Sequence, residues 1–394
     1  MPRHALGSQI VVRVSLKGVF AAGLLLTMSA TAAVRAEEPI YIGSSIPLTG
    51  NAAFWGQHSR WGAQLAVDEA NAAGGALGRQ IRVEYQDNQC NPTEAVKSVS
   101  QMLSAKRDVA ILDGTCSSAV LAIMPLVQRA QVPFVVANAT ATSIVDQSGV
   151  GGNKWTFKIN PSDGSLAVAL VQYLVDHERD KAAKIAVVGE DTDFGRGGAK
   201  ALSAALATHG LKLASADFYQ QGTPDFTALL TKLRAEKPGL IAVYSIGADF
   251  QNLIRQYVSF GVGIPLTGRL LTDLVPAEIM KSGALDGSSA VQPYVPEVDT
   301  PAAKKFLAEF QQKYHALPNI LSRESYEATR VLIAAIKRAG KADPAAIRQA
   351  LTKTDMKSIL GAELKFDDHN LAHDLAVIVT VKGGKVAIAA LNRT

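Results

Sequence analysis

Residues 109–137 read VAILDGTCSSAVLAIMPLVQRAQVPFVVA. Within this stretch the apolar run 109–112 predicts a buried strand, residues 117–130 predict a helix, and residues 133–137 predict a second strand. Two buried strands joined by a helix are typical of a βαβ unit, in which the strands are parallel and the crossover is right-handed. The stretch therefore predicts an α/β fold with mostly parallel sheets.

The same alternation continues on both sides of this unit, and the chain of 394 residues is long enough for two or three domains. A turn-rich joint at 146–153 separates two similar series. Further strands are predicted at 40–46, 81–85, 184–188, 212–219, 240–244 and from 265, and helices at 59–73, 92–105, after Phe194, at 226–236 and 252–260. Longer helices at 300–314, 323–339 and 343–352 precede a closing strand pair at 375–381 and 386–391. We expect two lobes, each a mostly parallel sheet flanked by helices, joined by several hinge crossovers.

We assign residues 37–158 and 292–373 to an N-terminal lobe, and residues 159–291 and 374–394 to a C-terminal lobe. In open α/β sheets ligands lie outside the carboxyl ends of the strands. For two facing lobes, this rule predicts a ligand in the cleft between them.

The formal net charge of +5 is concentrated at the start of the chain. Residues 1–36 hold four basic side chains, Arg3, Arg13, Lys17 and Arg35, and no acidic one. An apolar stretch at 18–33 and small residues before Glu37 predict a Sec-type signal peptide cleaved after residue 36, rather than an uncleaved membrane anchor. We expect an exported protein without a lipid anchor, free in an oxidising compartment, whose mature part has 36 basic and 35 acidic residues and a net charge of +1.

The chain has two cysteines, Cys90 and Cys116. An oxidising compartment would let them persist as a disulfide, and the alternative is two buried free thiols.

Sequence signatures of catalysis are absent. There is no Gly-x-Ser-x-Gly elbow, no His-Glu-x-x-His and no phosphate-binding Gly-x-x-x-x-Gly-Lys-Ser/Thr loop. Residues 367–374 contain Asp and His side chains, but Asn370 within them indicates a solvated turn rather than a metal site. Scattered basic residues and sparse aromatic ones give no support for nucleic-acid binding. A binding protein without metal or cofactor fits these absences better than an enzyme does.

Three groups of motifs resemble the branched-chain amino acid binding proteins of bacterial ABC transporters, which have the type I periplasmic binding fold. They are GSSIPLTG at 43–50 with AFWG at 53–56 and EANAAGG at 69–75, DNQCNP at 87–92 with GTCSS at 114–118, and NATAT at 138–142 with EDTDFG at 190–195. The resemblance covers the whole predicted mature chain in the same order. It implies a monomer that closes its two lobes on a small molecule and delivers it to permease subunits in the inner membrane. It also implies a disulfide between Cys90 and Cys116.

The resemblance implies a set of ligand-binding residues as well. Ser117 with neighbouring backbone N–H groups, and Thr140 with the backbone of Asn138 and Ala139, would hold the ligand carboxylate; Trp55 would cover the ligand and Phe194 would clamp it. Independently of the resemblance, Ser117 begins a predicted helix after a strand, and such a helix start favours an anion. The simpler interpretations are that the serines only cap the helix and that Trp55 is a core residue.

One position departs from the family pattern. Amino acid binders of the family have an acidic residue, which pairs with the ligand ammonium, where an ungapped match places Leu270. A buried ammonium without a carboxylate is costly. Unless Asp273 or Glu324 substitutes, we therefore expect a carboxylate or amide with an apolar or aromatic body rather than an ordinary α-amino acid.

The further candidates for ligand contact, beyond the carboxylate-binding and aromatic residues, are Cys116, Ser118, Ile246, Leu270, Asp273 and Glu324. The sequence thus predicts the substrate-binding subunit of an ABC importer that captures an amino acid-like compound or an apolar or aromatic acid. A sensory receptor of the same fold and an exported hydrolase are the alternatives.

Overall fold

The computed structural model describes residues 11–13 and 37–394. The predicted signal peptide, residues 1–36, lies outside this part of the chain except for residues 11–13. Within the described ranges, no helix combines the length and the apolar composition that a membrane span requires.

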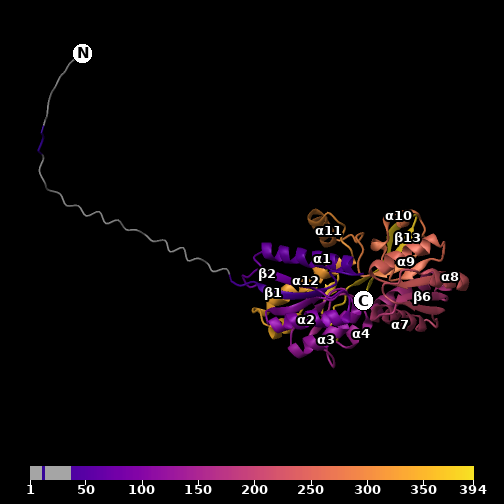
Figure 1. The fold of residues 1–394 in the computed structure, drawn as a ribbon, viewed down its shortest axis with the longest axis horizontal. Coiled ribbons are helices and arrows are strands. Elements are labelled where there is room, and N and C mark those ends of the chain that lie inside the picture. Colours follow the sequence, from indigo (N-terminus) through magenta and orange to yellow (C-terminus); the bar gives the residue numbers. More distant parts are fainter. Residues whose placement is uncertain (1–10, 14–36) are drawn as a thin grey trace, which may run out of the picture. The chain divides into compact units, whose positions relative to one another are not determined.

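The first lobe is built on a five-stranded sheet of order β2-β1-β3-β4-β5, in which every neighbouring pair is parallel. Its elements from the first part of the chain are β1 (Ile40–Ile46), α1 (Ala53–Ala72), β2 (Ile81–Asp87), α2 (Pro92–Ala105), β3 (Asp108–Asp113), α3 (Ser117–Ala130), β4 (Phe134–Val136), α4 (Thr142–Asp146) and β5 (Thr156–Lys158). The later elements α11 (Pro301–Tyr314), α12 (Ile320–Ala339), α13 (Pro344–Leu351), β11 (Met356–Lys357) and β12 (Glu363–Leu364) lie on the same side (Figure 1).

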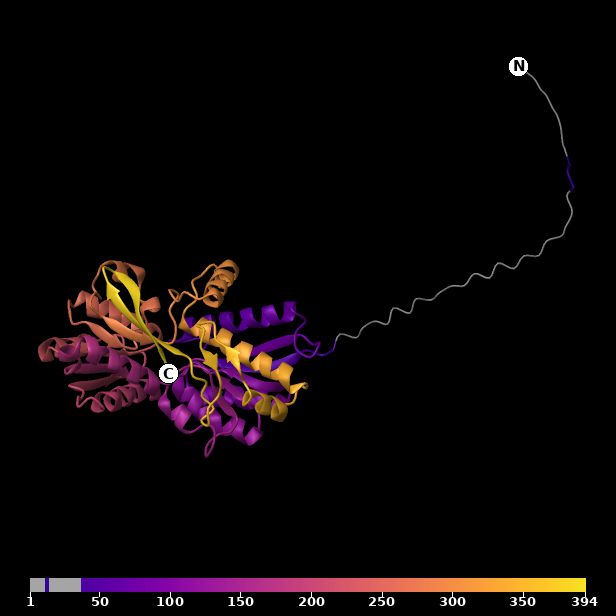
Figure 2. The same cartoon turned by 180° about the vertical axis from the view of Figure 1, so that it is seen from behind.

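The second lobe contains a parallel sheet of order β7-β6-β8-β9 and an antiparallel sheet of order β10-β13-β14. Its elements are α5 (Asp163–His177), α6 (Arg179–Ala182), β6 (Ile185–Glu190), α7 (Asp193–Ala207), β7 (Ser215–Tyr219), α8 (Thr227–Glu236), β8 (Leu240–Tyr244), α9 (Gly247–Ser259), β9 (Leu266–Gly268), the 3₁₀ helix η1 (Thr272–Leu274), α10 (Ala277–Lys281), β10 (Ser289–Gln292), β13 (Leu375–Lys382) and β14 (Lys385–Arg393). The view from behind shows the β13–β14 pair reaching this lobe while α12 packs on the first (Figure 2).

The predicted two-lobed α/β architecture is confirmed. The chain crosses from the first lobe to the second between β5 and α5, and α5 packs against α7. It returns to the first lobe between β10 and α11 and crosses to the second lobe again before β13. The turn-rich segment 146–153 does not separate the lobes, contrary to the sequence interpretation. It lies between α4 and β5, and β5 still pairs with β4, so the chain leaves the first lobe only after this strand.

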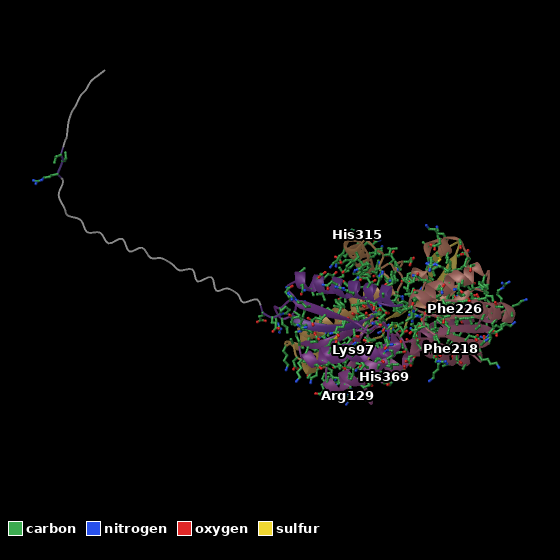
Figure 3. All side chains as sticks on the ribbon, viewed as in Figure 1. Lys97, Arg129, Phe218, Phe226, His315 and His369 are labelled. Atoms are coloured by element: carbon green, nitrogen blue, oxygen red, sulfur yellow. A yellow bond between two sulfur atoms is a disulfide. The ribbon has the colours of Figure 1, made fainter. Side chains whose placement is uncertain are left out.

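Within the segment that we predict to be a solvated turn, residues 368–370 form a turn in which Asp368 and His369, the latter labelled in Figure 3, are exposed, whereas Asn370 is buried. The Oδ1 atom of Asp367 accepts hydrogen bonds from the backbone N–H groups of His369 and Leu371, at 2.8 and 2.9 Å. Its Oδ2 atom lies 3.0 Å from Nε2 of His373. Among the described residues, no group of three or more His, Cys, Asp or Glu side chains is arranged to hold a metal ion.

Helices α1 and α12 pack closely against each other, and Gly62 permits this approach. A Cβ atom at Gly62 would lie 1.9 Å from the backbone oxygen of Ser322. We expect Gly62→Ala to separate the helices and to lower the free energy of unfolding by about 1–3 kcal/mol, which urea denaturation would measure.

Gly197→Ala is the matched control, because Gly197 is also helical and a Cβ there would meet only the Ala141 Cβ atom at 3.9 Å. We expect this control to be neutral or stabilising, since alanine favours helices over glycine. Equal destabilisation by both substitutions would show that the α1–α12 contact is not tight.

Candidate functional site

Residues of both lobes line a cavity between them, which we call the inner cavity. Segments that follow β3 and β4 line it on the first lobe, and segments that follow β6, β8 and β9 line it on the second. These are the carboxyl ends of parallel strands, where α/β sheets bind ligands. The lining residues are Trp55, Thr115, Cys116, Ser117, Asn138, Ala139, Thr140, Phe194, Ile246, Arg269, Leu271, Ile320, Leu321 and Glu324.

The start of α3 opens into the inner cavity. Cys116 is the N-cap, with extended backbone angles (φ −106°, ψ 128°), and its side chain makes no capping hydrogen bond. The first backbone N–H to bond back to the Cys116 oxygen is that of Val120, at 3.0 Å. The N–H groups before it have no acceptor within the helix, which gives this end a partial positive charge. The helix start therefore offers several donors to an anion in the cavity.

The disulfide between Cys90 and Cys116 is present, as the resemblance implies, and it fixes this helix start. The two Cα atoms lie 5.5 Å apart. Cys90 lies between β2 and α2, so the bond ties the N-cap of α3 to the segment that joins these two elements. It thereby holds the helix start in place at the cavity wall.

The polar side of the inner cavity is a buried hydrogen-bond network that links both lobes. The Thr140 hydroxyl of the first lobe donates to Oδ2 of Asp163 at 3.0 Å. Arg269, from the segment after β9, donates through Nη1 to Oδ1 of the same carboxylate at 3.3 Å. The hydroxyl proton of Thr140 is therefore engaged by Asp163 rather than free for a ligand.

Glu324 enters the cavity wall from α12. Its Oε2 atom accepts from the side-chain amide of Asn160 at 3.2 Å, and the side chain is fully buried. Behind it, the buried Lys158 ammonium donates to the backbone oxygens of Asn160 and Pro161 at 2.6 and 3.0 Å. Burial raises the pKa of the Glu324 carboxyl to about 8 and lowers the pKa of the Lys158 ammonium to about 7. Burial therefore favours the neutral carboxylic acid form of Glu324.

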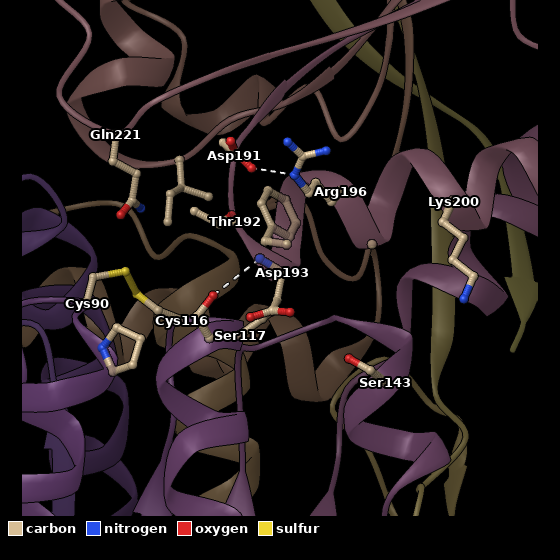
Figure 4. A pocket seen from close by; sticks show the side chains of 15 residues that line it. Cys90, Cys116, Ser117, Ser143, Asp191, Thr192, Asp193, Arg196, Lys200 and Gln221 are labelled. Atoms are coloured by element: carbon tan, nitrogen blue, oxygen red, sulfur yellow. Dashed lines mark hydrogen bonds and ion pairs between the residues drawn. A yellow bond between two sulfur atoms is a disulfide. The ribbon is translucent and has the colours of Figure 1, made fainter.

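A second, more open cavity adjoins the inner one, and we call it the outer cavity (Figure 4). Ser118 of α3 and Asp193 of α7 meet there, because the Asp193 backbone N–H donates to the Ser118 hydroxyl oxygen at 3.2 Å. Arg196 forms an ion pair with Asp191 beside them. The starts of two helices, one from each lobe, thus touch at the mouth of the inner cavity.

Asn51 makes a further contact between the lobes. Its side chain donates to Oδ2 of Asp249 at 3.1 Å and accepts from the backbone N–H of Ala248 at 2.9 Å. Both partners belong to α9 of the second lobe. Contacts at Ser118 and at Asn51 therefore hold the lobes together around the inner cavity.

The structure brings most of the sequence-predicted residues to one place. The inner cavity is lined by Trp55, Cys116, Ser117, Asn138, Ala139, Thr140, Phe194, Ile246 and Glu324. Ser118 lies in the wall of the outer cavity instead. Leu270 is fully buried and lies outside the inner-cavity lining, while Asp273 lines a different cavity and accepts from the backbone N–H of Ile320 at 3.2 Å. The structure therefore places neither Leu270 nor Asp273 where a pocket wall or an ammonium partner was expected.

Sequence reasoning missed five residues of the inner cavity, namely Thr115, Arg269, Leu271, Ile320 and Leu321. Gly268 has a positive φ of 77°, so the chain turns directly after β9. Arg269 and Leu271 then line the cavity and Leu270 does not. Gly268 was the sequence signal that could have indicated this turn, because glycine adopts a positive φ without strain. Successive side chains after the turn point to opposite sides, so Arg269 and Leu271 share a side that Leu270 does not.

Comparison with known families gives one match over most of the chain. The sequence profile of the family described as "Periplasmic binding protein" matches residues 39–385. A "Leucine-, isoleucine-, valine-, threonine-, and alanine-binding protein" of Pseudomonas aeruginosa is 27% identical over 335 residues, which cover 84% of this chain and 87% of the relative. The "Leu/Ile/Val-binding protein homolog 7" of Brucella abortus is 26% identical and covers 86% and 88% of the two chains.

Solved structures share the fold at lower sequence identity. A solute-binding protein of an R. palustris ABC transporter, in complex with benzoate, superposes with a TM-score of 0.80 at 20% identity, covering 90% of this chain and 96% of that one. A branched-chain amino acid transporter substrate-binding protein of Streptococcus pneumoniae, in complex with isoleucine, gives a TM-score of 0.76 at 24% identity, covering 91% and 99%.

Proposed function

The chain belongs to the periplasmic binding protein family, and on that premise we propose that it is the substrate-binding subunit of an ABC importer. In this proposal it captures a small carboxylate between its two lobes and presents the closed form to the permease subunits in the inner membrane. The ligand favours closure only through contacts that it makes in the closed state. The P. aeruginosa relative is an amino acid-binding protein by name, which agrees with this assignment.

The observation that carries the proposal is the free start of α3 in a cavity shared by both lobes. The unpaired N–H groups after Cys116 suit a carboxylate. Trp55 and Phe194 give the same cavity aromatic walls. We assign the carboxylate of the ligand to Ser117 and its neighbouring backbone N–H groups, with the backbone of Asn138 and Ala139 opposite. The apolar part of the ligand lies between the two aromatic side chains.

We further propose that the working protein is a monomer in the periplasm. Residues 1–36 would direct its export and be removed, and residues 37–394 would then carry 36 basic and 35 acidic side chains. Its lobes divide the chain as 37–158 with 292–373, and 159–291 with 374–394. The observed crossovers after β5, after β10 and before β13 support these boundaries.

Ser117→Asp tests the carboxylate site. An acidic side chain is favourable at a helix start, so we expect the variant to fold. It places a negative charge where the ligand carboxylate would bind, and like charges in such a site cost several kcal/mol, so affinity should fall by about 100-fold or more. Isothermal titration with benzoate and leucine as probes measures this change.

The control is Ala345→Asp, which adds the same charge at the exposed first turn of α13. It should leave the affinity for both probes unchanged. If Ser117→Asp binds a probe as tightly as this control does, the ligand carboxylate does not lie at the start of α3.

A further inference from the structure

Four side chains that line the inner cavity each have one buried polar atom without a hydrogen-bond partner within the described residues, namely those of Thr115, Asn138, Arg269 and Glu324. Two of these atoms, Nε of Arg269 and Oε1 of Glu324, belong to ionisable side chains. The residues are 4% and 0% exposed. Leaving such groups unpaired costs about 1–3 kcal/mol each, and more for a charged group. A ligand that pairs with both atoms recovers this free energy.

The two atoms come from different lobes. Arg269 follows β9 of the second lobe, and Glu324 lies on α12, which packs on α1 of the first lobe. A ligand atom that binds to both side chains therefore connects the lobes directly. Such a contact exists only in the closed form, so it adds to the free energy that drives closure.

The neighbouring groups limit what this ligand atom is. Arg269 already binds Asp163 through Nη1, and Glu324 binds Asn160 through Oε2. Nε of arginine is only a donor, so the ligand must supply an acceptor. Oε1 of Glu324 donates when the carboxyl group is protonated and accepts when it is ionised. A carbonyl or carboxylate oxygen of the ligand can accept from the protonated Glu324 carboxyl group. A ligand hydroxyl group can pair with either the protonated or the ionised form.

An ammonium group fits less well. It has no acceptor for Nε of Arg269, which would stay unpaired. It would also add a positive charge to a region that holds Arg269, Lys158 and Arg323, all close enough to lower the pKa of the Glu324 carboxyl against the larger effect of burial. A ligand oxygen atom can pair with Nε of Arg269 and with Oε1 of Glu324 without adding this charge.

We propose that Arg269 and Glu324 together bind one oxygen atom of the ligand, so that the preferred substrates are carboxylic acids with a second oxygen group. This inference rests on the proposed function, since it takes the first carboxylate to lie at the start of α3. The shared chemistry is an acceptor oxygen, which a hydroxy acid, an oxo acid or a dicarboxylic acid supplies.

The test compares probes that differ at one atom. One series is 4-methyl-2-oxopentanoate, 2-hydroxy-4-methylpentanoate and leucine, and the other is 4-hydroxybenzoate and benzoate. We expect the oxygen-bearing members of at least one series to bind about tenfold more tightly or better than leucine or benzoate, because a hydrogen bond to a charged donor is worth about 1.5–3 kcal/mol. Isothermal titration on the full mature chain measures these affinities.

Two substitutions assign the preference to its residues. Arg269→Lys keeps a positive charge beside Asp163 but has no Nε donor of the same geometry. The preference for the oxygen-bearing probes over leucine or benzoate should therefore drop to about threefold or less. Glu324→Gln keeps the shape of a neutral acid and still offers a donor, so binding of the oxygen-bearing probes should persist. A carboxylate that pairs with an ammonium would not tolerate this change. The midpoint of thermal unfolding of each variant verifies that it is folded.

Three results would overturn the inference but not the proposed function. In each of them a probe still binds to the wild-type protein, and Ser117→Asp still abolishes that binding. They are a preference for leucine that Glu324→Gln abolishes, equal affinity across both series, and an oxygen preference that Arg269→Lys leaves unchanged. Failure of every probe to bind the wild-type protein would count against the inference and the proposed function together.

Discussion

Arg323→Met is expected to lower the free energy of unfolding by about 3–5 kcal/mol, the cost of leaving buried charges without their partner. Arg323 is fully buried on α12 and forms ion pairs with Asp374 and, at 3.9 Å, with Glu327. Asp374 lies in the crossover that leads into β13, and its Oδ1 atom accepts from the Ser358 hydroxyl at 2.9 Å. The substitution therefore leaves the buried Asp374 carboxylate without its cation, while Glu327 keeps its pair with Arg330 at 2.5 Å.

Urea denaturation of Arg323→Met and of Lys97→Met measures this difference. Lys97 pairs with Glu94 at 3.3 Å, but both side chains are largely exposed, at 64% and 36%, and such pairs contribute about 1 kcal/mol or less. A double variant, Arg323→Met with Asp374→Leu, should recover part of the loss, since it removes a charge left without its partner. If Arg323→Met were no less stable than Lys97→Met, the buried network would not support the crossover.

Removal of the disulfide should have the second large effect. The two cysteines lie 26 positions apart, and closing a loop of this length stabilises the folded state by about 3.5 kcal/mol in the chain-entropy account. We expect Cys90→Ala with Cys116→Ala to lose this amount in urea denaturation. Affinity for a carboxylate probe should fall as well, because Cys116 is the N-cap of the helix that faces the cavity.

Dithiothreitol provides the control for this prediction. It should shift the unfolding midpoint of the wild-type protein towards that of the double variant and leave the double variant itself unchanged. An unfolding midpoint of the wild type that does not respond to the reductant would contradict the stabilising role of the disulfide.

Helix α3 illustrates what the sequence could predict. Its predicted range, 117–130, coincides with the observed helix, because the apolar periodicity is strong and Gln131 adopts the left-handed conformation that ends it. Helix α1 begins at Ala53 rather than at the expected residue 59, because its N-cap, Ala52, makes no side-chain hydrogen bond that would mark the start. Capping residues are the local signal for a helix start, and α1 lacks one.

The residues of the inner cavity also differ in whether the local sequence could predict their place. Ser117 could be placed from the order of strands and helices, because it begins a helix after a strand, whereas Thr140 was placed by the family resemblance. Arg269 could not, because its role depends on the turn at Gly268 and on a carboxylate, Asp163, that is 106 positions away in the sequence. Such pairings follow from the packing of the two lobes and leave no local pattern.

Mass spectrometry of the small molecules released when the purified protein is denatured tests the central claim most directly. The account predicts that the wild-type protein, purified without added ligand, releases a small carboxylic acid in near-equimolar amount. It predicts that Ser117→Asp releases little or none, while Ala345→Asp matches the wild type. Release of the same compound in equal amount from Ser117→Asp, or release of a compound without a carboxyl group, would contradict the account.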